Sequence, residues 1–289
     1  RQALEAGVGR IIVDNFHELD LLDRLTRERD TRAAILLRLT PGIEPHTHKA
    51  IQTGGVDSKF GFGMIDGTAM EAVKRALEVP GVEVRGLTCH IGSQIFDLEP
   101  FGLAAQAMVA FMAQARRELD LAFRELNLGG GLGIRYLPED APPAIESVVR
   151  SVAEAFTAAL EAQDLPHPEL FLEPGRSIVG DAGVTLYTVG AVKPIPGVRT
   201  YASVDGGMFE NPRPALYGAR YTAVLAERAT DPPDGPVTIA GRCCESGDVL
   251  IWEADLPRVR PDDLLAVFST GAYTYSMASN YNRFPRPAV

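Results

Sequence analysis

Two glycine-containing motifs could bind an anion and a flat, nitrogen-containing ring. Residues 129–133 read GGGLG, and adjacent glycines let backbone N–H groups turn toward one phosphate, or simply form a flexible turn. In EPGR, residues 173–176, Arg176 could form a bidentate pair with a phosphate. Glu173 could keep a pyridine-type nitrogen protonated. Alternatively, Glu173 and Arg176 pair with each other.

Histidine, serine and tyrosine side chains in two further motifs suit the same kind of ligand. HIGSQ, residues 90–94, places His90 and Ser93 just after an apolar run. An imidazole can stack on a heteroaromatic ring, and the Ser93 hydroxyl could bind a phosphate or phenolic oxygen, although a histidine that only satisfies the core is the alternative. Tyr273, in GAYTYSMASNYN (271–282), could bind a phosphate or could pack in the core.

A proline-stiffened segment, NPRPALYGARY (211–221), carries Arg213 and Tyr217. Arg213 could hold a substrate carboxylate at a site where lysine would be a poor substitute, and a structural turn is the alternative. Taken together, the motifs require a phosphorylated, flat, pyridine-like cofactor and a substrate that carries a carboxylate. Pyridoxal 5'-phosphate meets this requirement.

The stretch GRCCESGDVL, residues 241–250, places Cys243 and Cys244 side by side. The sequence has three cysteines, which are too few for a disulfide scaffold and are typical of a reducing, cytoplasmic setting. A disulfide between neighbouring cysteines is strained. If the segment is extended, its adjacent side chains point to opposite faces, and only one cysteine can face a ligand.

Metal, nucleic acid and membrane are not expected as partners. HTH, residues 46–48, offers two histidines, but no third ligand at a suitable spacing supports a metal site. The net charge of −10 argues against nucleic acid and anionic membrane surfaces, which require clustered lysine and arginine. No apolar run is long enough to span a bilayer.

The chemistry-bearing motifs follow apolar runs that alternate with helical patterns. Strands are predicted at 9–15, 33–39, 82–92, 123–131 and 169–176, and helices at 17–28, 69–79, 103–119 and 144–163. This alternation predicts a parallel sheet. Functional residues at the strand ends are typical of a (β/α)8 TIM-type barrel, of whose eight strands about five are visible. The fold is therefore either an open sheet or a partial barrel that lacks strands before residue 1.

Beyond about residue 180 the pattern changes to strand-like runs separated by glycine and proline, which predicts an all-β domain. We therefore expect an α/β plus all-β chain. Residues 1–180 would form a partial (β/α)8 barrel that binds the cofactor, and residues 181–289 a C-terminal β domain.

Six motifs, in order, resemble the diaminopimelate decarboxylase family of alanine-racemase-like pyridoxal-phosphate enzymes. They are HIGSQ, LNLGGGLG, EPGRSIVG, VDGGMFENPRPALYGARY, CESGD and GAYTYSMASNYN. The resemblance runs from about residue 9 to the end of the chain. It implies decarboxylation of meso-2,6-diaminopimelate to L-lysine, the last step of lysine biosynthesis. Related decarboxylases of ornithine, arginine or carboxynorspermidine share some of these elements and remain the alternative.

The resemblance also implies roles for residues on the cofactor side. His90 would stack on the cofactor ring with Ser93 near it, and Glu173 would contact the pyridine nitrogen. The phosphate would be bound by Gly129, Gly130 and Gly131, with Gly175, Arg176 and Tyr273 also binding cofactor.

On the substrate side, the resemblance assigns the carboxylate to Arg213 and Tyr217, with Arg176 serving both phosphate and substrate and Tyr273 touching both cofactor and substrate. Glu245 would recognise the distal ammonium group, and Cys244 would be the catalytic proton donor after CO2 leaves. In the family, Cys244 and Glu245 would reach the active site of the neighbouring subunit, so the expected active unit is a homodimer.

The lysine content departs from the family pattern. The family's Schiff-base lysine stands in a YAxKAN-like motif, and none of Lys49, Lys59, Lys74 and Lys193 does. We therefore expect a chain truncated at the N-terminus, and slightly at the C-terminus, that is inactive alone. A non-catalytic homologue that binds pyridoxal phosphate without this lysine is the alternative.

Overall fold

The computed structural model describes residues 1–43, 55 and 58–289, and contacts divide these into two compact units. The α/β unit consists of Arg1–Gly133 and Pro143–Pro174, and the β unit of Ile134–Pro142 and Gly175–Val289. The chain thus enters the β unit, returns and enters it again, and the domain limits expected from the sequence, 1–180 and 181–289, remain a prediction. His46, His48 and Lys49 lie outside the described residues.

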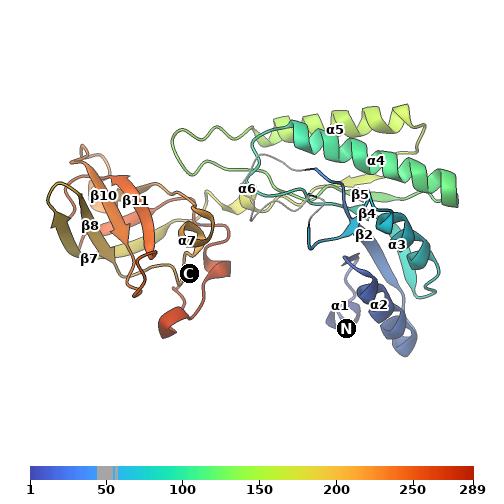
Figure 1. The fold of residues 1–289 in the computed structure, drawn as a ribbon, viewed down its shortest axis with the longest axis horizontal. Coiled ribbons are helices and arrows are strands. Elements are labelled where there is room, and N and C mark those ends of the chain that lie inside the picture. Colours follow the sequence, from blue (N-terminus) through green and yellow to red (C-terminus); the bar gives the residue numbers. More distant parts are fainter. Residues whose placement is uncertain (44–54, 56–57) are drawn as a thin grey trace. The chain divides into compact units, whose positions relative to one another are not determined.

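Five parallel strands form the main path of the sheet in the α/β unit (Figure 1). In spatial order they are β1 (Ile11–Val13), β2 (Ala33–Thr40), β4 (Val82–Thr88), β5 (Glu125–Asn127) and β6 (Glu169–Phe171). Spatial order equals chain order, as right-handed β-α-β crossovers of a barrel require. This confirms the predicted partial (β/α)8 barrel. A two-residue strand that was not predicted, β3 (Phe62–Gly63), pairs with the end of β2.

Four helices connect these strands and bury one face each: α2 (Phe16–Arg29), α3 (Thr68–Leu77), α4 (Glu99–Leu119) and α5 (Ile145–Ala162). The short helix α1 (Gln2–Glu5) precedes β1 and has no buried residue. Helices α4 and α5 lie side by side (Figure 1). The Asn15 side chain caps α2 by accepting the Glu18 N–H, and Asp30 ends that helix in the left-handed region. The predicted helices are therefore present with ends shifted by a few residues.

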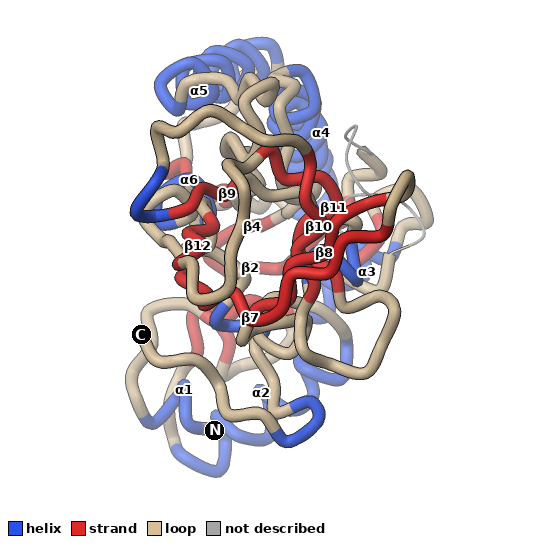
Figure 2. The backbone as a smooth tube through the Cα atoms, turned by 90° about the vertical axis from the view of Figure 1, so that its left-hand side faces the viewer, coloured by secondary structure: helices blue, strands red, loops and turns tan. Residues whose placement is uncertain are grey.

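The β unit is built on one six-stranded sheet, in which β8, β10 and β11 lie side by side (Figure 2). Its spatial order is β11 (Val249–Asp255), β10 (Pro236–Ala240), β8 (Arg199–Val204), β7 (Thr185–Ile195), β12 (Leu264–Val267) and β9 (Ala223–Leu225). Only the β8–β10 pair is parallel. This sheet confirms the predicted C-terminal β domain.

Short helices lie outside the sheet of the β unit. They are α6 (Arg176–Val179), α7 (Arg213–Tyr217), η2 (Ala226–Arg228), η3 (Tyr275–Met277) and η4 (Tyr281–Arg283). Helices α6 and α7 each begin at an arginine that the sequence analysis singled out, and both arginines are buried. These short helices therefore place two cations inside the β unit.

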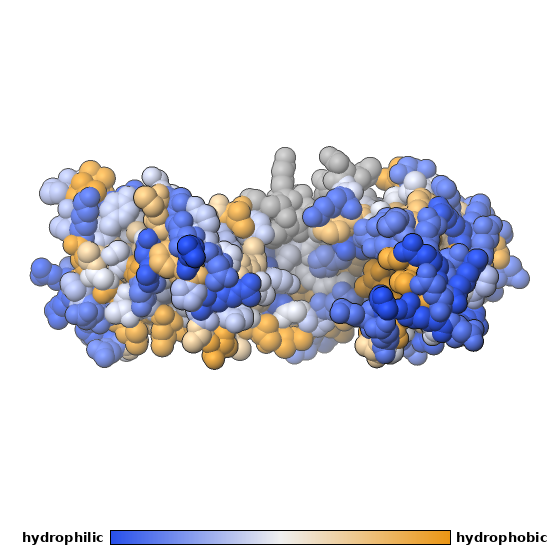
Figure 3. Space-filling model, turned by 90° about the horizontal axis from the view of Figure 1, so that it is seen from below, coloured by the Kyte–Doolittle hydropathy of each residue, from blue (hydrophilic) through white to orange (hydrophobic). Residues whose placement is uncertain are grey.

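Each unit has its own hydrophobic core, and the surface carries apolar residues in separate groups. On the face drawn in Figure 3, such groups stand among hydrophilic residues. Exposed apolar side chains include Ile145 and Val149 on α5 and Leu186 on β7. No helix in the described parts of the chain is long and apolar enough to cross a membrane.

We predict that the Gly86→Ala substitution destabilises the α/β unit. A Cβ atom at Gly86 would overlap the backbone carbonyl of Glu125 on the neighbouring strand β5. Such overpacking costs about 1–3 kcal/mol. Chemical denaturation should show this loss, whereas Gly9→Ala, where nothing lies within 4 Å of the added atom, should change the unfolding free energy by less than about 0.5 kcal/mol. Equal effects of the two substitutions would contradict the prediction.

Candidate functional site

The glycine loop that follows β5, residues 129–133, packs closely against the backbone segments that follow β4 and β6. Gly129 and Gly131 have φ of +70° and +104°, which favours glycine at both positions. A Cβ atom at Gly129 would lie 2.6 Å from the Cys89 carbonyl and 2.7 Å from Nδ1 of His90. At Gly130 it would overlap the Glu173 carbonyl, and at Gly131 the Gly92 carbonyl. The structure therefore places three predicted motifs, HIGSQ, GGGLG and EPGR, in direct contact.

His90 is held in one tautomer by the glycine loop. The Gly130 N–H donates to Nδ1 of His90 at 3.2 Å, so the neutral ring carries its proton on Nε2. Burial lowers the pKa of His90 and the Arg38 charge adds to this, while Glu173 opposes both. The imidazole is therefore uncharged at neutral pH, and a neutral flat ring is suited to stacking. Ser93 lies in the turn after His90, half-buried.

Asn127, at the end of β5, is a residue that the sequence analysis missed. Its Nδ2 donates to a carboxylate oxygen of Glu173 at 2.7 Å, and its Oδ1 accepts the Gly129 N–H at 2.8 Å. The side chain is buried. Asn127 thereby fixes both the acid expected to hold a ring nitrogen and the loop expected to hold a phosphate. The LNL of LNLGGGLG contained this residue, but nothing in the pattern distinguished it from another strand residue.

In the β unit, two buried arginines share one tyrosine. Arg176 donates to the hydroxyl of Tyr136 and stacks on Tyr273, with its guanidinium carbon 4.7 Å from the ring centre. The guanidinium of Arg213 lies 4.8 Å from the centre of the Tyr136 ring. Arg176 and Arg213 are each 6% exposed. Two desolvated cations that meet one neutral phenol ring form a region that attracts anions.

A second tyrosine, Tyr221, completes the cluster around Arg213. The Arg213 guanidinium donates to the Tyr221 hydroxyl at 2.5 Å, and the Tyr136 and Tyr221 rings meet edge to face at 5.3 Å. No carboxylate forms an ion pair with Arg213 among the residues that the structure describes. Its charge is therefore available to a ligand. Tyr136 was not predicted, and Tyr221 was quoted only as part of a motif.

Other predicted residues border this cluster. Tyr217 closes α7 four residues after Arg213, half-buried. Gly175 precedes α6, and a Cβ atom there would lie 3.8 Å from the Tyr273 hydroxyl. Tyr273 has φ of +60° and is 45% exposed. A strained tyrosine whose ring covers a buried arginine on one face and meets solvent on the other is well placed for a ligand contact.

In the loop at residues 241–248, the two neighbouring cysteines differ in how far they are buried. It consists of bends and turns, so the alternation expected for an extended segment does not apply. Cys244 is exposed and Cys243 half-buried. Burial raises the pKa of Cys243 to about 11, with the negative charge of Asp248 contributing. The Cys243 thiol therefore stays protonated at neutral pH.

Glu245 in this loop accepts a hydrogen bond from the hydroxyl of Tyr281 in the C-terminal segment. The same bond raises the pKa of Tyr281. CESGD and GAYTYSMASNYN thus meet within the β unit.

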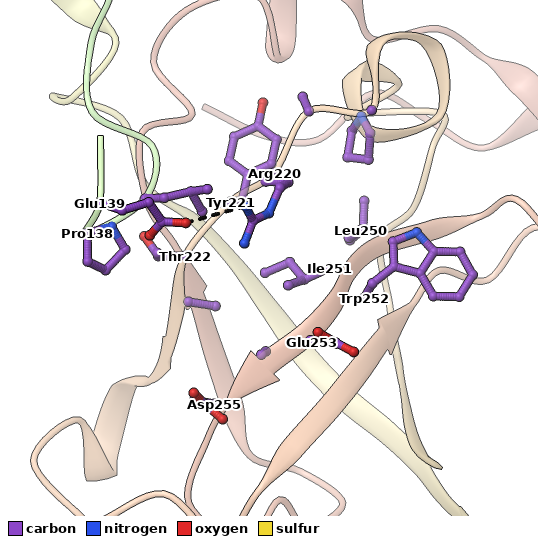
Figure 4. Close-up of a pocket in the computed structure, with 16 residues that line it drawn as sticks. Pro138, Glu139, Arg220, Tyr221, Thr222, Leu250, Ile251, Trp252, Glu253 and Asp255 are labelled. Atoms are coloured by element: carbon purple, nitrogen blue, oxygen red, sulfur yellow. Dashed lines mark hydrogen bonds and ion pairs between the residues drawn. The ribbon is translucent and has the colours of Figure 1, made fainter. Parts of the chain in front are cut away.

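A separate pocket of about 560 Å³ lies between β11 and the residues that lead into β9, the two edge strands of the sheet. Figure 4 shows Arg220 and Glu139 pointing toward one another at its rim, where they form an ion pair at 3.3 Å. Of the described residues that line the pocket, none is a predicted site residue. Tyr221 links the pocket to the arginine cluster.

Comparisons with known proteins agree on one family. Residues 1–180 match the family described as pyridoxal-dependent decarboxylase, pyridoxal binding domain. The diaminopimelate decarboxylase of Bacillus methanolicus is 53% identical over 287 residues, which are 99% of this chain and 66% of that protein. That of Bacillus subtilis strain 168 is 51% identical over 289 residues, covering 100% of this chain and 66% of that protein.

Solved structures give the same result. Diaminopimelate decarboxylase from M. jannaschii in co-complex with L-lysine superposes with a TM-score of 0.89 at 35% identity, covering 99% of this chain and 64% of that one. The enzyme from Helicobacter pylori complexed with L-lysine gives 0.87 at 30% identity, covering 99% and 68%. The chain thus spans 66% of the length of the first two curated relatives.

We predict that a thiol reagent distinguishes the two neighbouring cysteines. Because the pKa of Cys243 is raised to about 11, about a thousandth of this thiol is thiolate at pH 8, and thiolate is the reactive form. Iodoacetamide at pH 8 should therefore label the Cys243→Ala variant, through exposed Cys244, much faster than the Cys244→Ala variant. In Cys244→Ala, the labelling rate should rise about tenfold per pH unit up to about pH 11. Mass spectrometry of the labelled peptide measures both rates, and a plateau near pH 9 would refute the assignment.

Proposed function

Because the chain belongs to the pyridoxal-dependent decarboxylase family, we propose that the whole protein decarboxylates meso-2,6-diaminopimelate to L-lysine with pyridoxal phosphate as cofactor. The observation that carries the proposal is identity of 51% and 53% to diaminopimelate decarboxylases across both units. The activity is assigned to the whole protein, because this chain spans about two thirds of those relatives. The decarboxylases of ornithine, arginine and carboxynorspermidine remain alternatives within the family.

The residues of the α/β unit fit the cofactor. We assign Gly129, Gly130 and Gly131 to the phosphate, as the family resemblance implies. The Gly129 and Gly130 N–H groups donate to Asn127 and His90, so a phosphate bound at either would replace a bond within the protein. Neutral His90 offers a flat ring for stacking, and Ser93 follows it in the same turn. Glu173 is exposed, with one carboxylate oxygen held by Asn127, so it can keep a pyridine nitrogen protonated. When bound, pyridoxal phosphate withdraws electrons from the bond to the departing carboxylate.

The residues of the β unit supply charge for the anionic parts of cofactor and substrate. We assign Arg176, with Gly175 and Tyr273, to cofactor binding, and Arg176, Arg213, Tyr217 and Tyr273 to the substrate. Arg213 is supported most directly, because it is buried and no carboxylate pairs with it in the part of the chain that the structure describes. A buried guanidinium prefers a bidentate carboxylate partner to solvent. The substrate carboxylate can fill this role.

Glu245 and Cys244 are assigned to the other end of the substrate and to the proton. The Glu245 carboxylate, oriented by Tyr281, is suited to bind the distal ammonium group of diaminopimelate. Cys244 is exposed, and its Sγ can give a proton to the substrate carbon that has lost CO2. Cys243 lacks this access.

The state of assembly and the compartment are part of the proposal. We assign the active form to a homodimer in which Cys244 and Glu245 serve the neighbouring subunit, as the family resemblance implies. The exposure of Cys244 is compatible with such a role. We place the enzyme in the cytoplasm, because all three cysteines are free and free thiols are typical of reducing compartments.

One observation favours a second candidate, a cofactor-binding protein without catalysis. None of the four lysines in the sequence stands in a YAxKAN-like motif, and a lysine amine is the group that attaches pyridoxal phosphate covalently in such enzymes. Cofactor binding without release of CO2 from any of the candidate substrates would favour this alternative for the whole protein.

We predict that the whole protein with bound cofactor releases CO2 from meso-diaminopimelate and that Cys244→Ala lowers kcat by about a hundredfold or more, the usual contribution of a positioned proton donor. Cys243→Ala should have a much smaller effect. The absorbance band of bound pyridoxal phosphate should stay unchanged in both variants, which separates loss of proton transfer from loss of cofactor. Equal loss of kcat in the two variants would sink the assignment of Cys244, and no CO2 from the unmodified enzyme would sink the function.

A further inference from the structure

Asp248 is a buried carboxylate that binds two separate backbone segments. It is 3% exposed. Its Oδ1 accepts the N–H of Met208 at 2.7 Å, and its Oδ2 accepts the N–H of Cys243 at 2.7 Å. Met208 belongs to the segment 205–212 that leads directly into Arg213, and Cys243 to the loop that carries Cys244. One side chain therefore ties the arginine segment to the cysteine loop.

The backbone of Asp248 closes the same loop. Its N–H donates to the Glu245 carbonyl at 3.0 Å, and its carbonyl accepts the Gly241 N–H at 2.8 Å. Together with the two carboxylate bonds, every polar group of Asp248 is bound to the loop or to segment 205–212. The loop path from Gly241 to Asp248 is thus fixed at both ends by one residue.

Two glycines make room for this carboxylate. A Cβ atom at Gly207 would lie 2.7 Å from an Asp248 carboxylate oxygen, and one at Gly241 would overlap both oxygens. In the same loop, Gly247 has nothing within 4 Å of an added Cβ. Alanine at position 207 or 241 would therefore displace the Asp248 carboxylate, whereas alanine at position 247 would not.

The charge of Asp248 is balanced by N–H groups. No arginine or lysine forms an ion pair with it within the described ranges. An anion buried in this way is costly unless several hydrogen bonds replace water. If position 248 served only to pack the loop, a neutral side chain would be buried there at a lower free-energy cost than a carboxylate. The negative charge also helps to keep Cys243 protonated, so Cys244 is the reactive neighbour.

Further bonds hold the loop on the same segment. The Arg242 N–H donates to the Gly206 carbonyl, and its guanidinium to the Asp205 carbonyl, both at 3.1 Å. These contacts run along segment 205–212 beside the Asp248 bonds. Arg242 thus holds the start of the loop, whereas the Asp248 carboxylate binds both the loop, at Cys243, and the segment, at Met208.

We propose that Asp248 is a positioning residue for the decarboxylation. It fixes the backbone of the Cys244–Glu245 loop on segment 205–212, which leads into Arg213. The Cys244 thiol and the Glu245 carboxylate thereby keep a set geometry. The inference rests on the proposed function for its kinetic consequence, although the bonds of Asp248 can be measured without it. Displacement of a catalytic group by about 1 Å can cost a hundredfold in rate.

The test is Asp248→Asn in the whole holoenzyme, with Asp231→Asn, an exposed aspartate in a loop of the same unit, as the control. Asparagine keeps the size but turns one acceptor into an N–H2 group that faces an N–H donor. We expect kcat per cofactor-loaded site to fall about tenfold or more, with cofactor affinity unchanged within about twofold. Hydrogen exchange at the Met208 and Cys243 amides should rise about tenfold or more. A purely structural role would lower the melting temperature and leave kcat per loaded site unchanged.

A second pair of variants keeps the inference testable if Asp248→Asn does not fold. Gly241→Ala displaces the carboxylate and should reproduce both the loss of kcat and the faster exchange, whereas Gly247→Ala should do neither. Wild-type exchange at Met208 and Cys243 in either disruptive variant would refute the bonds, and faster exchange with wild-type kcat would refute the positioning role. If the unmodified enzyme releases no CO2 from diaminopimelate, the proposed function fails, while the exchange rates still decide whether Asp248 holds the loop.

Discussion

The candidate site depends first on how closely the glycine loop passes the chain on either side of it. Gly130 lies against the Glu173 carbonyl and Gly131 against the Gly92 carbonyl, with no room for a Cβ atom. This packing brings three strand ends to one place, which is the property of a parallel barrel that makes its carboxyl edge useful. The Gly129 and Gly130 N–H groups are used within the fold, where they donate to Asn127 and His90.

Each of three groups that we propose to face a ligand is held by a buried polar neighbour. Asn127 holds Glu173, Tyr136 holds Arg176, and Asp248 holds the loop of Cys244. A group that must meet a ligand cannot satisfy all its bonds within the protein, because it would then have none to offer. Its orientation must therefore come from another residue, whose own polar atoms are used up inside the fold.

The sequence predicted the fold well, because its signals are local. Continuous apolar runs identified all five main strands of the α/β unit. The change, near residue 180, to strand-like runs separated by glycine and proline identified the β unit. The return of residues 134–142 to the β unit could not be read in this way, since it depends on Thr222 and Ser269 bonding to that segment from far along the chain. Tyr136 was missed for the same reason.

Asp248 was quoted in CESGD, but only burial and two distant N–H partners reveal its role.

The separation of the two neighbouring cysteines shows where pattern and structure diverge. In an extended strand, Cys243 and Cys244 would point to opposite faces, and the sequence pattern alone would not say which thiol is the more exposed. The loop instead gives them unequal surroundings: one thiol lies near a buried carboxylate, and the other meets solvent. The pKa of Cys243 is raised first by burial and then by Asp248, five residues further along the chain, and strand geometry predicts neither effect. Reactivity at this loop is a property of the fold around the cysteine pair.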